Sequence, residues 1–376
     1  MSETSTTKHL LHRAYLYITE QQEKEALATL DQISINNKEE QVEVAYLRAW
    51  CYTLEEHWDE AAQFLLDPEI SGENITDIQS IGQTERRRRA YYLLLLGNIA
   101  SNLGRFEEAT RHYAQCIKFL DERRMNVPGV RLRARMGLGT AYTQTGYYAV
   151  ALTHYEDALR LCKDDDGHVD VPDICYGMAD AHRHLGNFEQ AIDFSKRALQ
   201  IYVQRSQKDL EGRMRNLLGR IYYQMRDFQT ASYYYTEALA LSMLVNRPGM
   251  MITNLTALAD LRLEEGLLDE ARRYSENARQ YIDRSPSPHY VGMAYIVSGK
   301  VAEAEANQTT GQKAKDLQDE AIGWYKKAIT TLSPLEVKVE LSEAYGRLAQ
   351  LLEITGKQGE ALQYWREAYS VYSPRD

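Results

Sequence analysis

The sequence lacks the features that mark secreted and membrane proteins. Only 4 cysteines occur among 376 residues, with no C-x-x-C pair and no framework spacing, which favours a reducing compartment. No run of about 18 apolar residues is present, so no transmembrane helix is predicted. The polar stretch 1–8 has no apolar core, so no signal peptide is predicted either. We therefore expect a cytoplasmic protein.

Catalytic and ligand-binding motifs are also missing. The sequence has no phosphate-binding or dinucleotide-binding glycine loop and no G-x-S-x-G elbow. His182 and His184 are two residues apart, so on a helix they point away from each other. Aligning the acidic loop near residue 167 to an EF-hand places Cys162 first and Asp173 last, and the ligand set fails. We expect no enzyme activity, no metal and no cofactor.

Acidic residues outnumber basic ones, 54 to 44. The formal net charge is −10, which argues against direct binding of nucleic acid or of a membrane surface. The one basic run, residues 86–89, consists of four arginines that would spread around a helix. It indicates a solvated or ion-paired face, or else a contact with an anion or an acidic partner.

What the sequence does contain is a repeat of about 40 residues. Successive small residues are 42, 40, 40, 40 and 40 residues apart, and an alanine follows twelve residues after five of them. The small residues are Gly97, Gly139, Ala179, Gly219, Ala259 and Gly299, and the alanines are Ala109, Ala151, Ala191, Ala231 and Ala271. Such self-similarity indicates one supersecondary unit stacked many times, in which each copy packs on its neighbours.

Each unit is predicted to be a hairpin of two α-helices. In the unit that ends at Ala158, apolar residues recur at intervals of three and four on both sides of a turn at Gly146. Glycine suits the left-handed end of a first helix, and proline suits its first turn, where the missing N–H has no partner. The other turn glycines are Gly104, Gly186 and Gly266, and the prolines that mark helix starts are Pro128, Pro248 and Pro288.

The hairpin pattern resembles the tetratricopeptide repeat (TPR), in the subset with long repeats. One unit shows the signature in full as Leu138, Gly139, Tyr142, Gly146, Tyr148, Ala151, Tyr155 and Ala158. The resemblance implies an all-α fold, a right-handed α–α superhelix of about nine hairpins. We expect two degenerate hairpins at 1–66, a loop or possible break at 67–85, and the main superhelix at 86–376 with an insertion at 306–320.

In the family, the first helix of each hairpin lines a concave groove. The resemblance therefore implies that residues around the position after the small residue bind a partner, because side chains three or four apart share one helix face. The expected groove residues are Asn98, Asn102, Thr140, Gln144, Tyr176, Asp180, Arg183, Asn216, Arg220, Tyr223, Gln224, Thr256, Asp260 and Lys300.

Four of these groove positions alternate in charge along the chain: Asp180, Arg220, Asp260 and Lys300. Two interpretations remain open, and both can hold at once. The four can form an internal ladder of salt bridges, each contributing about 0.2–1 kcal/mol when exposed. They can also grip the backbone or termini of a bound peptide. The carboxylate clamp of chaperone-binding relatives is not expected, because Leu94 stands where its lysine would be.

The sequence thus predicts a TPR module that binds a peptide or protein segment in its concave groove, without direct contact to nucleic acid or membrane. The alternative is the sensor part of a bacterial peptide-responsive transcriptional or signalling regulator, which the chain resembles in repeat length and size. Those regulators have an N-terminal helix-turn-helix or three-helix bundle. Here the hairpin rhythm begins by Leu10, and no separate DNA-reading helix is found.

Overall fold

The structure, a computed structural model, describes residues 3–19, 22–35, 38–54, 57–65, 83–163, 165–285, 287–335 and 337–371. Regular secondary structure in these ranges is entirely helical, which confirms the all-α prediction. The chain forms two compact units, unit 1 (Met1–His168) and unit 2 (Val169–Asp376). The predicted break at 67–85 lies mostly outside the described residues. No helix in the described part combines the length and apolar character that crossing a bilayer demands.

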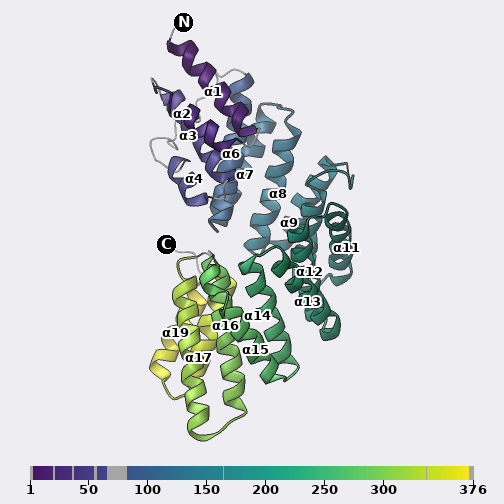
Figure 1. Ribbon diagram of the computed structural model, residues 1–376, viewed down its shortest axis with the longest axis vertical. Helices are drawn as coiled ribbons and strands as arrows, with labels where there is room; N and C mark the ends of the chain where they lie inside the picture. The colour runs from purple at the N-terminus through teal and green to yellow at the C-terminus, as the bar shows by residue number, and fades with distance from the viewer. Residues whose placement is uncertain are drawn as a thin grey trace. The chain divides into compact units, whose positions relative to one another are not determined.

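Unit 1 consists of successive hairpins that pack on one another in chain order (Figure 1). Its helices are α1 (Glu3–Thr19), α2 (Glu23–Leu30), α3 (Lys38–Leu54), α4 (Trp58–Leu65), α6 (Gln83–Asn102), α7 (Phe106–Glu122), α8 (Pro128–Gln144) and α9 (Tyr148–Leu161). Among the described side chains, one hydrophobic cluster joins α1, α2, α3, α4 and α6, and another joins α6, α7 and α8. No single hairpin encloses a core of its own, so each depends on its neighbours.

Unit 2 continues the same arrangement with five hairpins. Its helices are α10 (Val171–His184), α11 (Phe188–Gln204), α12 (Lys208–Gln224), α13 (Phe228–Leu244), α14 (Pro248–Glu264), α15 (Leu268–Arg279), α16 (Pro288–Asn307), α17 (Gly311–Leu332), α18 (Lys338–Ile354) and α19 (Gln358–Ser370). Together the described parts of the two units contain nine hairpins, the predicted number.

The predicted helix starts and turns are confirmed. Three first helices, α8, α14 and α16, begin at the predicted prolines. The four predicted turn glycines have left-handed φ angles between 75° and 87°, a region that side chains rarely adopt. In the turn between α12 and α13, Arg226 takes this place with a φ of 63°. The turn therefore favours glycine without requiring it.

The repeated small residue is explained by close packing of the first helix against the second. Gly219 on α12 lies against the ring of Tyr235 on α13, and a Cβ at Gly219 would come within 2.5 Å of that ring. The same contact joins Gly97 to Tyr113, Gly139 to Tyr155 and Gly299 to Tyr325. Sixteen residues after Ala179 and Ala259, a serine stands in place of the tyrosine: Ser195 or Ser275. In the repeats with glycine, a tyrosine on the second helix therefore packs against that glycine on the first helix.

The insertion at 306–320 lengthens one hairpin. The helices α16 and α17 have 20 and 22 residues, against 17 in α12 and α13. A short turn joins them, and Gly311, the first residue of α17, has a φ of 69°. The extra residues are therefore helical and extend the hairpin beyond its neighbours.

The first helices of each unit lie closer together than the second helices do. Contacts join α6 to α8 in unit 1, and α12 to α14 and α14 to α16 in unit 2. No pair of successive second helices makes contacts as extensive in the described ranges. Each stack therefore bends toward its first helices, which form its inner face. We call this face the first-helix wall of each unit.

Candidate functional site

In unit 1, the predicted groove residues Asn98 and Thr140 each form a hydrogen bond with a buried tyrosine of the second helix. The hydroxyl of Tyr113 donates to Oδ1 of Asn98 over 2.9 Å. The hydroxyls of Tyr155 and Thr140 are 3.2 Å apart. The predicted residues of this wall with exposed side chains are Asn102, Thr140 and Gln144. At these three predicted positions, the first-helix wall of unit 1 presents uncharged amide and hydroxyl groups.

In unit 2, Asp180 and Arg183 on α10 form a buried ion pair. Nε and Nη2 of Arg183 donate to Oδ1 of Asp180 over 2.9 and 2.7 Å. Burial acts to raise the pKa of Asp180, but Arg220 and Arg183 together lower it. Burial and then Arg183 lower the pKa of His184 to about 4, so this imidazole is neutral at pH 7. Arg183 is only 4% exposed, so it orients Asp180 and is not itself accessible to a ligand.

Arg220 on α12 is exposed and has no carboxylate oxygen within 4 Å in the part of the chain that the structure describes. Its charge still acts across the wall. Burial acts to raise the pKa of Glu340 on α18, but His289 and, more weakly, Arg220 lower it. The helices α12 and α18 are three hairpins apart, so the wall of unit 2 curves round a shared space.

The second half of this wall is a closed network of ion pairs. Nζ of Lys300 on α16 is 2.6 Å from Oδ1 of Asp260 on α14 and 3.5 Å from Oε1 of Glu343 on α18. Arg347 lies 3.3 Å from Glu343 and 3.5 Å from Glu303. Burial acts to lower the pKa of Lys300, but its two acidic neighbours raise it. The salt-bridge ladder therefore exists here, between α14, α16 and α18.

The remaining predicted residues differ in accessibility. Nδ2 of Asn216 on α12 donates to Oδ1 of the buried Asn254 on α14 over 2.8 Å. Thr256 is only 2% exposed and donates to a backbone carbonyl of its own helix, so it does not face a ligand. Tyr223 is half-buried, and burial raises its pKa to about 12. Gln224 is exposed at the end of α12.

Sequence reasoning missed several side chains of this wall. The guanidinium of Arg213 on α12 lies over the ring of Tyr176, with Cζ 5.2 Å from the centroid. Arg213 precedes Asn216 by three residues, so extending the predicted face by one more turn would have found it. The other missed residues are Asn254, Glu303, Glu340, Glu343 and Arg347.

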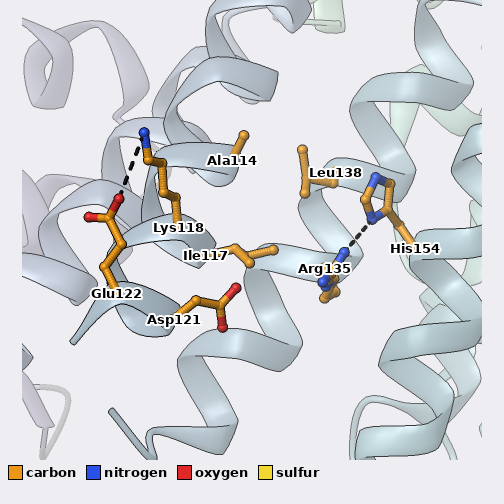
Figure 2. A pocket seen from close by; sticks show the side chains of 8 residues that line it. All are labelled: Ala114, Ile117, Lys118, Asp121, Glu122, Arg135, Leu138 and His154. Atoms are coloured by element: carbon orange, nitrogen blue, oxygen red, sulfur yellow. Dashed lines mark hydrogen bonds and ion pairs between the residues drawn. The ribbon is translucent and has the colours of Figure 1, made fainter. Parts of the chain in front are cut away.

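Two open hollows lie elsewhere on the surface and include no predicted groove residue. One, of about 320 Å³, lies between α7, α8 and α9 in unit 1. Figure 2 shows Arg135 and His154 directed toward each other at its rim, with Nη1 and Nδ1 3.0 Å apart. The other, of about 400 Å³, is lined by residues of α13, α14 and the turn after α14. Both mix acids and bases that already contact one another.

Residues 95–298, more than half of the chain, match the MalT-like TPR region. The chain belongs to this family. The match confirms the predicted resemblance to tetratricopeptide repeats, and it runs from the middle of α6 to the middle of α16. No curated protein sequence matches this TPR chain.

Solved structures share the TPR fold. A Rap protein in complex with Competence and Sporulation Factor has a TM-score of 0.68 at 12% identity, covering 98% of each chain. The apo form of the quorum sensor NprR from B. thuringiensis has a TM-score of 0.65 at 15% identity, covering 98% of this chain and 99% of its own. NprR in complex with its cognate peptide NprX has a TM-score of 0.63 at 14% identity, with the same coverage. At these identities the likeness shows the fold alone.

Proposed function

We propose that this TPR chain binds a peptide or a segment of another protein along the first-helix wall of unit 2. The observation behind this proposal is that α10, α12, α14, α16 and α18 bring polar and charged side chains to one curved face. Rap and NprR support it, because both have been solved with peptides on this fold.

The wall suits an extended segment. Such a segment exposes backbone N–H and C=O groups, which amide side chains can satisfy in both directions. Asn216 is already fixed by its bond to Asn254, so it loses little freedom when a ligand binds. The exposed Gln224 lies two turns further along the same helix. This role needs no catalytic group, and we assign none.

The test is selection of random octapeptides displayed on phage against the full chain. We expect Asn216→Ala and Gln224→Ala each to weaken selected peptides by about tenfold, the loss of one or two hydrogen bonds. Thr236→Ala, an exposed position on the second helix α13, is the matched control and should bind normally. Thermal unfolding identifies any variant that is unstable. Failure to select peptides, or equal binding by all three variants, would overturn the proposal.

A more specific role is that of a sensor in a peptide-responsive regulator. This candidate is supported by Rap and NprR, whose structures align with 98% of this chain, the N-terminal hairpins included. Small-angle X-ray scattering with a selected peptide separates the two roles. A sensor should become more compact or change its oligomeric state on binding, whereas a passive adaptor should keep its radius of gyration.

A further inference from the structure

The first helix α12 has two arginines that make no ion pair within 4 Å in the described part of the chain. Arg213, Asn216 and Arg220, here called the α12 stripe, are three and four residues apart and therefore share one face. Both arginines are exposed, and neither has a carboxylate oxygen within 4 Å among the described residues. The stripe thus presents ten guanidinium N–H donors, none of which is bound by a carboxylate of the described residues.

Other cations of the same wall are paired. Arg183, Lys300 and Arg347 each have a carboxylate oxygen within 4 Å. The chain as a whole has 54 acidic and 44 basic residues, so unpaired arginines are not the consequence of a shortage of acids. The α12 stripe is therefore a local positive site within an acidic protein.

The residues around the α12 stripe do not neutralise its two charges through a direct ion pair. The ring of Tyr176 orients Arg213 by a cation–π contact, which leaves the charge of the guanidinium unneutralised. The two carboxylates that influence Arg220 have nearer partners. Asp180 accepts two hydrogen bonds from Arg183, and Glu340 lies 3.2 Å from His289.

We propose that the α12 stripe selects peptides with two carboxylates about three residues apart; this rests on the proposed function. Seven residues separate the two arginines, which is about 10 Å along an α-helix. Three residues of an extended chain span the same length. Each arginine can form a charge-assisted and bidentate pair with a carboxylate, from an acidic side chain or from the peptide's C-terminus. Asn216, between them, meets the backbone of the peptide.

The test compares three peptide libraries that differ only in a fixed Glu-x-x-Glu, Gln-x-x-Gln or Lys-x-x-Lys. We expect the full chain to retain the Glu library about tenfold better than the Gln library, and less so as salt is added. Arg213→Gln and Arg220→Gln should each reduce this preference several-fold. Arg273→Gln, an exposed arginine on the second helix α15, is the matched control and should leave it unchanged. Arg220→Glu should shift retention toward the Lys library.

The outcomes separate this inference from the proposed function. Equal retention of the Glu and Gln libraries, abolished by Asn216→Ala, would overturn the inference and leave the proposed function standing. No retention of any library would overturn both. Stronger binding of a short single-stranded oligonucleotide, lost in Arg220→Gln, would assign the stripe to phosphate and overturn it too. Thermal unfolding of both glutamine variants identifies any loss of stability, since Arg220 helps to lower the pKa of buried Asp180 and Arg213 contacts the ring of Tyr176.

Discussion

Unit 2 contains two pairs of successive hairpins, here called double hairpins, with the same pattern of small and charged residues at the wall. The charged residues pair differently in the two. In both, an alanine and an aspartate on the first helix are followed, one hairpin later, by a glycine and a cation. The residues are Ala179, Asp180, Gly219 and Arg220 in α10–α13, and Ala259, Asp260, Gly299 and Lys300 in α14–α17. The second set forms an ion pair of 2.6 Å, whereas Arg220 has none among the described residues.

A single position explains the difference. Three residues after the aspartate stands Arg183 on α10, but Leu263 on α14. Arg183 donates two hydrogen bonds to Asp180 on its own helix, and Arg220 has no carboxylate oxygen within 4 Å among the described residues. On α14 no cation stands at that position, so Asp260 pairs with the next first helix. The same alternation of charge therefore produces an open site in one place and a closed ladder in the other.

The largest contrast is expected when each aspartate is removed. Asp180→Ala leaves Arg183, whose side chain is 3% exposed, buried without its carboxylate, and should reduce the free energy of unfolding by about 3 kcal/mol. Asp260→Ala should cost about 1 kcal/mol, because the side chains of Asp260 and Lys300 are 28% and 18% exposed. Urea denaturation measures both. Replacing Arg183 by methionine in the Asp180→Ala chain should recover most of the loss, and an equal effect of the two single changes would contradict the comparison.

The glycine and alanine positions give the next contrast. A Cβ at Gly219 would lie 2.5 Å from the ring of Tyr235, which is buried and cannot move aside. We expect Gly219→Ala to cost about 2 kcal/mol through overpacking. Ala259→Gly has no such clash and should cost about 1 kcal/mol through helix propensity. In a Tyr235→Ser background, Gly219→Ala should become neutral or stabilising; an undiminished cost there would show that the ring is not the cause.

Much of the fold could be predicted because it depends on local packing and backbone geometry. Proline at Pro248 and glycine at Gly146 each favour one backbone conformation, so helix starts and turns followed from residue type. The small residues indicated where helices approach closely. The division after His168 could not be predicted, because the repeat period continues across it without interruption.

Less of the candidate site could be predicted. Helical spacing located the wall, but it did not tell which charges would pair. Whether Arg183 faces the ligand or turns back onto Asp180 depends on its rotamer and burial. Thr256 shares a helix with Asp260 but points toward a backbone carbonyl in the interior. The orientation of such side chains depends on packing against neighbouring hairpins. The spacing of residues within a single helix therefore does not predict it.

The two double hairpins should also differ in their response to acid. His184 has a folded pKa of about 4 against an ordinary 6.5, owing to burial and to Arg183. The unfolded chain therefore binds more protons between these values, and stability is lost as the pH falls from about 6.5 to about 4. Because 31% of the ring is exposed, we expect its share to be about 2 kcal/mol. The equivalent residue on α14 is Glu264, so α14 has no imidazole at this position.

Urea denaturation at several pH values checks this dependence. His184→Gln removes the titrating ring and should flatten the stability curve between pH 6.5 and 4. Glu264→Gln is the matched control and should leave this part of the curve as it is. An unchanged slope in His184→Gln would mean that the imidazole is accessible enough to protonate in the folded chain.

The smallest effect tests the cause of the whole comparison. Arg183→Leu gives α10 the residue that α14 has at this position, and it frees Asp180 to pair with Arg220. The coupling of that pair, from a double-mutant cycle with Asp180→Asn and Arg220→Gln, should rise by about 0.5–1 kcal/mol above its value in the presence of Arg183. The same change should weaken the preference for the Glu library, because Arg220 would then be neutralised from within. If the coupling does not rise, the position of α12 itself keeps Arg220 open, and the two double hairpins differ in backbone placement instead of in one side chain.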